Sequence, residues 1–185
     1  MEFLKTDIQD LLVLKPKVFG DARGYFFESY SAQEFNAAVG SEVTFVQDNE
    51  SLSTYGVIRG LHFQCPPFAQ AKLIRCVHGR VLDVAVDLRV DSPTYGKHFA
   101  IELSGENHLQ LFIPRGFAHG FAVLSKEAVC QYKCDNYYAP ESENGISVFD
   151  TSLGINWGID IADAVLSEKD KNRILLKNFD SPFKL

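Results

Sequence analysis

The chain has 185 residues, a formal net charge of -6 and 46% hydrophobic residues. This length and balance predict one globular domain over residues 1–185 and argue against a disordered chain. The negative charge argues against broad electrostatic binding to nucleic acid or to an anionic membrane. No apolar run is long enough to span a bilayer, and the acidic N-terminus differs from a signal peptide, so we expect a cytoplasmic protein.

Helical signals occur only towards the two ends of the chain. In SAQEFNAAVG, Ser31 and Glu34 have the spacing of a capping box, and Gly40 is a typical C-terminal stop. A second helix of one or two turns is predicted to begin after Ser167, because acidic residues follow this typical N-cap. The helices therefore flank a different kind of core.

From about residue 43 to residue 150, short β-rich runs alternate with turn signals. Residues 72–89 contain two such runs, separated by a turn at His78 and Gly79, which predicts a hairpin. The second run alternates apolar residues with a polar face that carries Asp83. We expect one face of this strand to pack and the other to carry carboxylates.

Further strands follow in the same core. A second hairpin is predicted from residues 99–103 and 108–114, which flank a Ser-Gly-Glu-Asn turn, and another strand from residues 128–134. Repeated antiparallel strands need a way to remove their free edges, and a closed barrel or a jelly roll provides one. The sequence therefore predicts an all-β fold with short flanking helices.

Four cysteines are present, and their spacing matches neither a zinc site nor a disulfide scaffold. We expect Cys65, Cys76, Cys130 and Cys134 to be reduced and structural. On a strand, Cys130 and Cys134 share a face with Tyr132, because side chains alternate with a period of two.

Two histidines occur among glycines and aromatic residues, His62 in RGLHFQ and His119 in PRGFAHGF. A single histidine in a β protein is more often structural, but PRGFAHGF has the residue order of the second cupin motif, where the histidine binds a metal. The ligands expected from the first cupin motif are missing, since His62 is followed by Gln64 and Lys72. An ammonium group repels a divalent cation, so we predict acid–base chemistry without a metal or other cofactor.

The chain resembles the dTDP-4-dehydrorhamnose 3,5-epimerase family over nearly its whole length. The resemblance rests on motifs that follow one another in the order of the family: GDARGYFFE, FVQDNES, GVIRGLHFQ, AQAKLIR, RVLDVAVDLR, SPTYGKH, PRGFAHGF, YKCDNYYAPESENGI, GINW and LSEKD. It implies a cupin-type jelly-roll barrel, a homodimer, no cofactor and a thymidine-diphosphate-linked 4-keto-6-deoxy sugar as substrate.

The resemblance also implies catalytic roles. A ketone at C4 acidifies the hydrogens on C3 and C5, so epimerisation requires a base, an enolate-stabilising group and an acid on the opposite face. The family pattern places the base at His62, the acid at Tyr132 and a positive charge beside the enolate oxygen at Lys72. Asp170 matches the carboxylate that pairs with the base, and Asp83 remains a rival partner because it points away from the packed face of its strand.

Binding roles follow from the same resemblance. His119 is expected to contact the enolate oxygen or the sugar ring, and Arg59 and Arg23 the diphosphate, since arginine makes bidentate contacts with phosphate. The family takes Arg23, together with Phe19 and Glu28, from the neighbouring subunit.

The nucleoside is expected to contact the FVQDN segment and a tyrosine. Gln47 and Asn49 offer amide groups to the base, with Asp48 between them, and Tyr138 offers a stacking surface. Two loop charges also match binding positions of the family: Glu143 and Lys169.

Together these features predict epimerisation of dTDP-4-keto-6-deoxy-D-glucose at C3 and C5, which gives dTDP-4-keto-L-rhamnose for dTDP-L-rhamnose biosynthesis. Two alternatives remain open. An epimerase acting at one carbon, or a ketoisomerase, would keep His62 and differ at Tyr132 or elsewhere in the pocket. A metal-binding or purely ligand-binding cupin would not exchange substrate protons.

Overall fold

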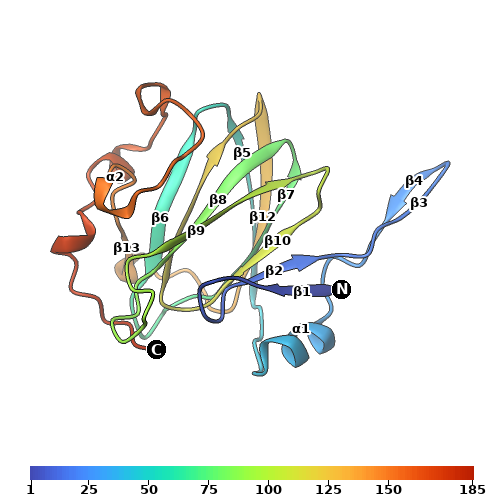
Figure 1. Ribbon diagram of the computed structural model, residues 1–185, viewed down its shortest axis with the longest axis horizontal. Helices are drawn as coiled ribbons and strands as arrows, with labels where there is room; N and C mark the ends of the chain where they lie inside the picture. The colour runs from blue at the N-terminus through green and yellow to red at the C-terminus, as the bar shows by residue number, and fades with distance from the viewer.

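The computed structural model describes residues 1–185 and has two antiparallel sheets at its centre (Figure 1). The six-stranded sheet has the order β1 (Glu2–Lys5), β2 (Leu12–Lys15), β10 (Gln110–Ile113), β7 (Lys72–His78), β12 (Glu127–Cys134) and β5 (Gln47–Thr54). The five-stranded sheet has the order β13 (Glu143–Gly145), β6 (Ile58–Gln64), β11 (Phe117–Val123), β8 (Arg80–Asp87) and β9 (His98–Ser104). The predicted all-β jelly roll is confirmed.

The two predicted hairpins are wrong, although their strands exist. β7 pairs with β10 and β12, whereas β8 pairs with β11 and β9, so the turn at His78 and Gly79 carries the chain from one sheet to the other. β9 and β10 are separated in the same way. A turn signal predicts that the chain reverses direction, but the strands that pair are chosen by the long-range packing of a jelly roll.

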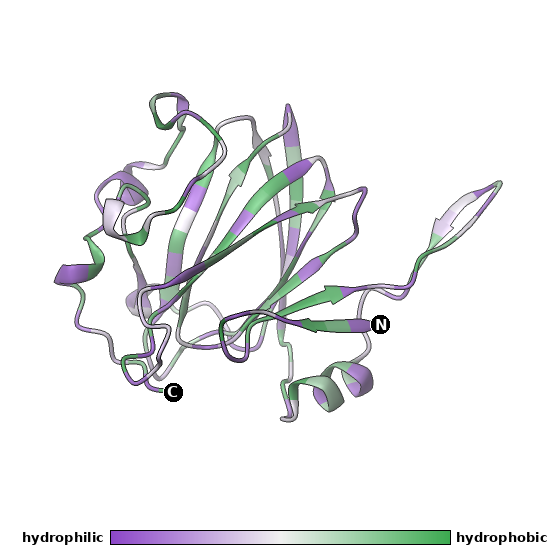
Figure 2. Cartoon of the chain, in the orientation of Figure 1, coloured by the Kyte–Doolittle hydropathy of each residue, from purple (hydrophilic) through white to green (hydrophobic).

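The hydrophobic core between the two sheets explains why consecutive strands belong to different sheets. Ile74 of β7 and Ala85 of β8 lie in one buried cluster, to which both sheets contribute. Apolar residues, green in Figure 2, run along the strands of both sheets. Burial of this apolar surface holds the sheets together at about 25 cal/mol per Å².

β8 is covered on both faces. Val84 and Val86 face a second cluster, built largely with the C-terminal segment that includes Trp157. Asp83 and Asp87 on this strand are also fully buried. The face that carries carboxylates is therefore turned inward, where each carboxylate needs a partner.

The predicted helices are both present, as α1 (Ala32–Val39) and α2 (Glu168–Lys171). The Ser31 side chain accepts a hydrogen bond from the backbone N–H of Glu34, and Gly40 ends α1 in the left-handed conformation. Glu34 does not complete the capping box, because its carboxylate pairs with the N-terminal amino group at 3.1 Å. Four short 3-10 turns complete the helical content: Pro140–Ser142, Thr151–Leu153, Ile161–Asp163 and Leu176–Asn178. No helix is both long and apolar enough to cross a membrane.

A two-stranded arm, β3 (Phe19–Asp21) and β4 (Gly24–Phe26), projects away from both sheets (Figure 1). Phe19, Tyr25 and Phe26 on this arm are exposed. An exposed apolar hairpin on a single subunit is typical of a segment that packs against a partner.

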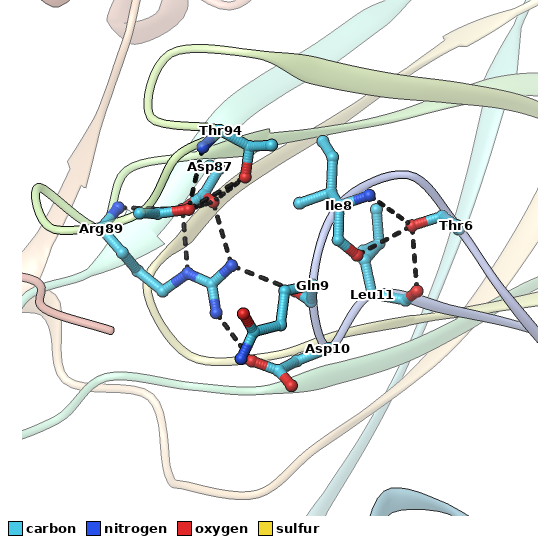
Figure 3. A network of polar contacts seen from close by, with 9 residues as sticks. Thr6, Ile8, Gln9, Asp10, Leu11, Asp87, Arg89 and Thr94 are labelled. Carbon is cyan, nitrogen blue, oxygen red and sulfur yellow. Dashed lines mark hydrogen bonds and ion pairs between the residues drawn. The ribbon is translucent and has the colours of Figure 1, made fainter.

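A polar network fixes the loop between β1 and β2 (Figure 3). Arg89 donates to both carboxylate oxygens of Asp87 at 2.9 Å, to Asp10 at 2.9 Å and to the carbonyl of Gln9 at 3.1 Å. Burial alone would raise the pKa of Asp87, but hydrogen bonds from Arg89 and neighbouring hydroxyl groups hold that pKa below its usual value. The network joins the end of β8 to the N-terminal loop with its buried charges paired.

Candidate active site

A cavity of about 410 Å³ opens between the two sheets and is called here the central cavity. Side chains from both sheets line it. They include most of the predicted catalytic and binding residues: Gln47, Asn49, Arg59, His62, Lys72, His119, Tyr132, Tyr138 and Glu143. The fold thus brings together residues that are up to 96 positions apart in the chain, from Gln47 to Glu143.

Glycines bring the two histidines side by side. A Cβ atom at Gly60 would lie 2.6 Å from the Cα of Gly120, and a Cβ at Gly120 would lie 2.6 Å from the carbonyl oxygen of Arg59. β6 and β11 can therefore approach closely only with glycine at both positions. In this register His62 is the direct cross-strand partner of His119.

His62 pairs with Asp170. Its Nε2 atom lies 2.5 Å from the Oδ1 atom of Asp170, and the backbone N–H of Asp170 donates to the Ser167 hydroxyl that caps α2. Burial alone would raise the pKa of Asp170, but the hydrogen bond and the charge of His62 hold that pKa below its usual value. The carboxylate therefore stays ionised beside the imidazole.

His119 pairs with the rival carboxylate. Its Nε2 atom lies 3.0 Å from an Oδ2 oxygen of Asp83, which comes from the neighbouring strand β8. The sequence left open whether Asp170 or Asp83 contacts His62. The geometry gives each histidine its own aspartate, with Asp170 on His62.

The opposite wall, formed by the six-stranded sheet, carries Lys72 and Tyr132. The Nζ atom of Lys72 lies 5.8 Å from the centre of the Tyr132 ring. Burial raises the pKa of the Tyr132 hydroxyl and lowers the pKa of the Lys72 ammonium. Tyr132 is therefore held in its protonated form, which is the form of an acid.

Amide groups occupy the β5 side of the cavity. Gln47 donates to the Oδ1 atom of Asn49 at 3.0 Å, and its own Oε1 accepts from the backbone N–H of Tyr138 at 3.2 Å. The exposed Tyr138 ring lies at the cavity, and its hydroxyl donates to Glu143 at 2.6 Å. These groups offer a hydrogen-bonding edge and a flat aromatic surface, as recognition of a planar base requires.

Glu143 is the centre of a charged group. Its Oε1 oxygen lies 2.6 Å from Lys169 Nζ and 2.8 Å from an Nη atom of Arg173. Burial opposes ionisation, but Lys169, Tyr138 and Arg173 together lower the pKa of Glu143 to about 2. The sequence did not single out Arg173, because an arginine three residues after Asp170 is unremarkable in a polar segment.

Five predicted binding residues do not line the central cavity. The carboxylate of Asp48 lies on the other face of β5 and pairs with Lys133 at 3.0 Å, because strand residues alternate between faces. The carboxylate of Asp48 therefore points away from the central cavity, and its predicted role in substrate binding stays a prediction. Lys169 lines a neighbouring side cavity of about 430 Å³, to which His62 and Asp170 also contribute. The other three lie on or next to the arm: Phe19, Arg23 and Glu28.

Arg23 does not line the central cavity. Its side chain is 89% exposed and pairs only with Asp21 on the same hairpin. The contribution of the arm residues to a neighbouring subunit stays a prediction.

Some residues at the cavity were not predicted: Ser51, Phe63, Gln64, Gln70, Phe121 and Cys134. The hydroxyl of Ser51 is buried without a hydrogen-bond partner. The alternation of FVQDNES, which brings Gln47 and Asn49 inward, also brings Ser51 inward and could have identified it. Gln64 stands where a metal ligand of the first cupin motif would be, and its amide donates to the carbonyls of Phe68 and Tyr137.

The cysteines divide between core and cavity. All four are free, and Cys76 and Cys130 lie in the cluster between the sheets. Cys134 lines the cavity next to Tyr132, as the alternation of the strand predicted. No group of three or more histidine, cysteine, aspartate or glutamate side chains is arranged to hold a metal ion.

Comparisons with known proteins agree on one family. The family described as dTDP-4-dehydrorhamnose 3,5-epimerase matches residues 5–178. A dTDP-4-dehydrorhamnose 3,5-epimerase of Shigella flexneri is 54% identical over 172 residues, which cover 93% of this chain and 94% of that protein.

Solved structures give the same answer. The dTDP-4-dehydrorhamnose 3,5-epimerase of Elizabethkingia anophelis superposes with a TM-score of 0.93 at 53% identity and covers 96% of this chain and 97% of its own. The dTDP-6-deoxy-D-glucose-3,5-epimerase of Legionella pneumophila, solved in complex with dTDP-4-keto-L-rhamnose, has a TM-score of 0.95 at 44% identity, with 100% and 98% covered. The chain therefore belongs to the dTDP-4-dehydrorhamnose 3,5-epimerase family and is an enzyme of the isomerase class.

Proposed function

We propose that this enzyme epimerises dTDP-4-keto-6-deoxy-D-glucose at C3 and C5 and releases dTDP-4-keto-L-rhamnose, for dTDP-L-rhamnose biosynthesis. Family membership supports the substrate class. The single observation that carries the mechanism is the placement of His62 and Tyr132 on facing sheets, at opposite walls of one cavity. Inversion of a carbon requires proton removal on one face and proton delivery on the other.

His62 is the base. Because Asp170 accepts a hydrogen bond from Nε2, the proton of the neutral ring stays on this atom and the lone pair of Nδ1 is free. Nδ1 takes the proton from C3 or C5, and the carboxylate of Asp170 stabilises the imidazolium that forms. No redox cofactor enters, because the C4 ketone supplies the acidity.

The enolate is stabilised by polar groups on both walls of the cavity. Lys72 supplies an N–H donor, whose ammonium form also brings positive charge to the enolate oxygen, and His119, held by Asp83, supplies a ring nitrogen on the other wall. Such preorganised groups act most strongly in the transition state, where the negative charge on O4 develops.

Tyr132 is the acid. Its pKa is raised by burial, so the hydroxyl is protonated at neutral pH and can deliver the proton to the face opposite His62. Loss of this proton donor would leave the base able to remove and return a proton on its own side only.

The nucleotide is bound along the mouth of the cavity. Arg59 contacts the diphosphate, Gln47 and Asn49 contact the base, and Tyr138 stacks on it. Arg59 is already held by the Ser53 hydroxyl at 2.9 Å, which preorganises its guanidinium.

The active unit is a homodimer. The arm carries Phe19 and Arg23 away from their own cavity, and the partner of each subunit contributes them, with Glu28, to the site. This exchange places the guanidinium of Arg23 near the diphosphate, which needs local positive charge because the chain as a whole has a net charge of -6.

The test is proton NMR of dTDP-4-keto-6-deoxyglucose incubated with the enzyme in deuterium oxide. Wild type is expected to place deuterium at C3 and C5, and His62→Ala to place none. Tyr132→Phe is expected to retain exchange without forming the inverted product. His78→Ala, which changes an exposed turn histidine outside the cavity, is the matched control and should behave like wild type.

Each outcome selects one function. Exchange at only one carbon would replace the proposal with a single epimerase, and substrate binding without exchange would replace it with a binding protein.

A further inference from the structure

Arg173 lies between two carboxylates of the site. Its side chain is only 10% exposed, one Nη atom donates to Glu143 at 2.8 Å, and its Nε atom lies 3.9 Å from Oδ1 of Asp170. Oδ1 is the same oxygen that contacts His62. The guanidinium therefore joins the pair at the base to the charged group at the cavity edge.

The fold makes room for this side chain at one position. Gly145 is the cross-strand partner of His62, and a Cβ atom there would lie 2.8 Å from the Nε of Arg173 and 2.6 Å from the carbonyl oxygen of Leu61. Any larger residue would displace the guanidinium from the strand next to the base.

The Nε–H group is buried and makes no hydrogen bond. An unpaired buried donor has lost its hydrogen bonds to water without gaining a partner, so such atoms are rare and need an explanation. The other unpaired buried atom of this kind is the Ser51 hydroxyl, which lines the central cavity. The Nε atom lies 3.9 Å from Oδ1 of Asp170. This distance is too long for a hydrogen bond but still within the range of an ion pair.

We propose that Arg173 is a positioning residue that keeps Asp170 anionic and tunes how readily His62 releases its proton. This inference rests on the proposed role of His62 as the base. A positive charge beside the pair lowers the proton affinity of both members. The base needs this tuning, because in each turnover it must take a proton from carbon and then release that proton to solvent, while Tyr132 regains its own proton from solvent.

The experiment removes the charge and follows the pH dependence. In Arg173→Met and Arg173→Gln, the acidic limb of kcat/KM should move to higher pH by about half a unit or more, because His62 binds its proton more tightly. Arg173→Lys, which retains the charge, should keep the wild-type limb. The other charged or titratable groups around the pair remain in the variants, and among them Glu143 loses its contact with Arg173 but keeps those with Lys169 and Tyr138. These groups are Arg59, Lys72, Asp83, His119, Tyr132, Glu143 and Lys169.

Lys171→Met is the matched control. It removes one positive charge from the same segment, but Lys171 pairs with the exposed Glu168 and does not contact the His62–Asp170 pair. Its profile should equal that of wild type. An unchanged acidic limb in both Arg173→Met and Arg173→Gln would overturn the inference, and an equal shift in Lys171→Met would show a general charge effect instead.

A second readout does not depend on turnover. Titration of the His62 imidazole by NMR in the ligand-free protein should give a higher pKa in Arg173→Gln than in wild type. An equal pKa overturns the role of Arg173 even if the wild-type enzyme acts on another substrate. Absence of exchange by wild type would instead overturn the proposed function alone.

Thermal unfolding of each variant checks that folded proteins are being compared. If Arg173→Met does not fold, Arg173→Gln replaces it, because its amide retains donors for Glu143.

Discussion

Two histidine–aspartate pairs lie next to each other in the five-stranded sheet, and they differ in exposure and in the origin of the aspartate. The side chain of His62 is 32% exposed and its partner comes from α2, whereas His119 is 8% exposed and its partner comes from the next strand of the sheet. The same two residue types thus form two different pairs. The His62–Asp170 pair is partly accessible to solvent, whereas both members of the His119–Asp83 pair are buried within the sheet. If the proposed roles hold, it is burial and the origin of the supporting aspartate, rather than residue type, that distinguish His62 as a proton carrier from His119 as a fixed hydrogen-bonding group.

The largest expected effect separates the two histidines. His62→Ala should lower the rate of deuterium exchange about 10⁴-fold, because the base itself is lost. His119→Ala should lower it about 100-fold, because only one enolate-stabilising contact is lost. NMR exchange rates at saturating substrate measure both. If the two variants lose equal activity, the assignment of different roles to the pairs is wrong.

Substitution of the two aspartates should lower activity in the same order as substitution of the histidines that they contact, but by smaller factors. Asp170→Asn should lower kcat about 100-fold, since the ring loses its orienting carboxylate, and Asp83→Asn should lower it about tenfold. Steady-state kinetics measure kcat and KM separately. A larger loss in Asp83→Asn than in Asp170→Asn would contradict the pairing of Asp170 with the base.

Mixing two inactive variants tests whether the arm completes the partner's site. Arg23→Ala and His62→Ala should each be inactive, but an equal mixture that reassorts should regain about a quarter of wild-type activity. Half of the dimers are then mixed, and each mixed dimer has one intact site. Sedimentation analysis of the mixture confirms that dimers are present. No recovery after reassortment would show that Arg23 serves its own subunit.

The smallest expected effect concerns acid stability. The pKa of Glu143 is about 2 in the folded protein, below its ordinary value of 4.5. A depressed pKa contributes stability that is present above pH 4.5 and is lost as the pH falls towards 2. The difference in unfolding free energy between wild type and Glu143→Gln should therefore shrink over this range, as urea unfolding at each pH can measure. A constant difference would mean that the ion pairs of Glu143 do not contribute.

The family resemblance predicted most of the candidate site, and local patterns in the sequence account for how two parts of it are placed. Alternation along the strands placed Tyr132 and Cys134 on one face, and the capping signal at Ser167 placed Asp170 at the start of a helix. Both follow from rules that act within a few residues. The same alternation shows why Asp48 turns away from its neighbours Gln47 and Asn49.

Contacts between residues far apart in the chain could not be predicted from the sequence. The turn at His78 was recognised, but the strands that it connects belong to different sheets, and the sequence around a turn does not specify the pairing. The role of Arg173 depends on the space above Gly145, which belongs to a strand 28 residues earlier in the chain. Neither relation has a local signal.

By itself, the sequence determined the β-rich core, the flanking helices, the family resemblance and the residues able to carry acid–base chemistry, because these depend on composition, alternation and short motifs. Only the tertiary structure decided which aspartate contacts which histidine, which strands share a sheet, and that Arg173 lies beside the His62–Asp170 pair. Those outcomes depend on how two sheets and a C-terminal segment pack over a common core, and packing joins residues whose separation in the chain carries no pattern.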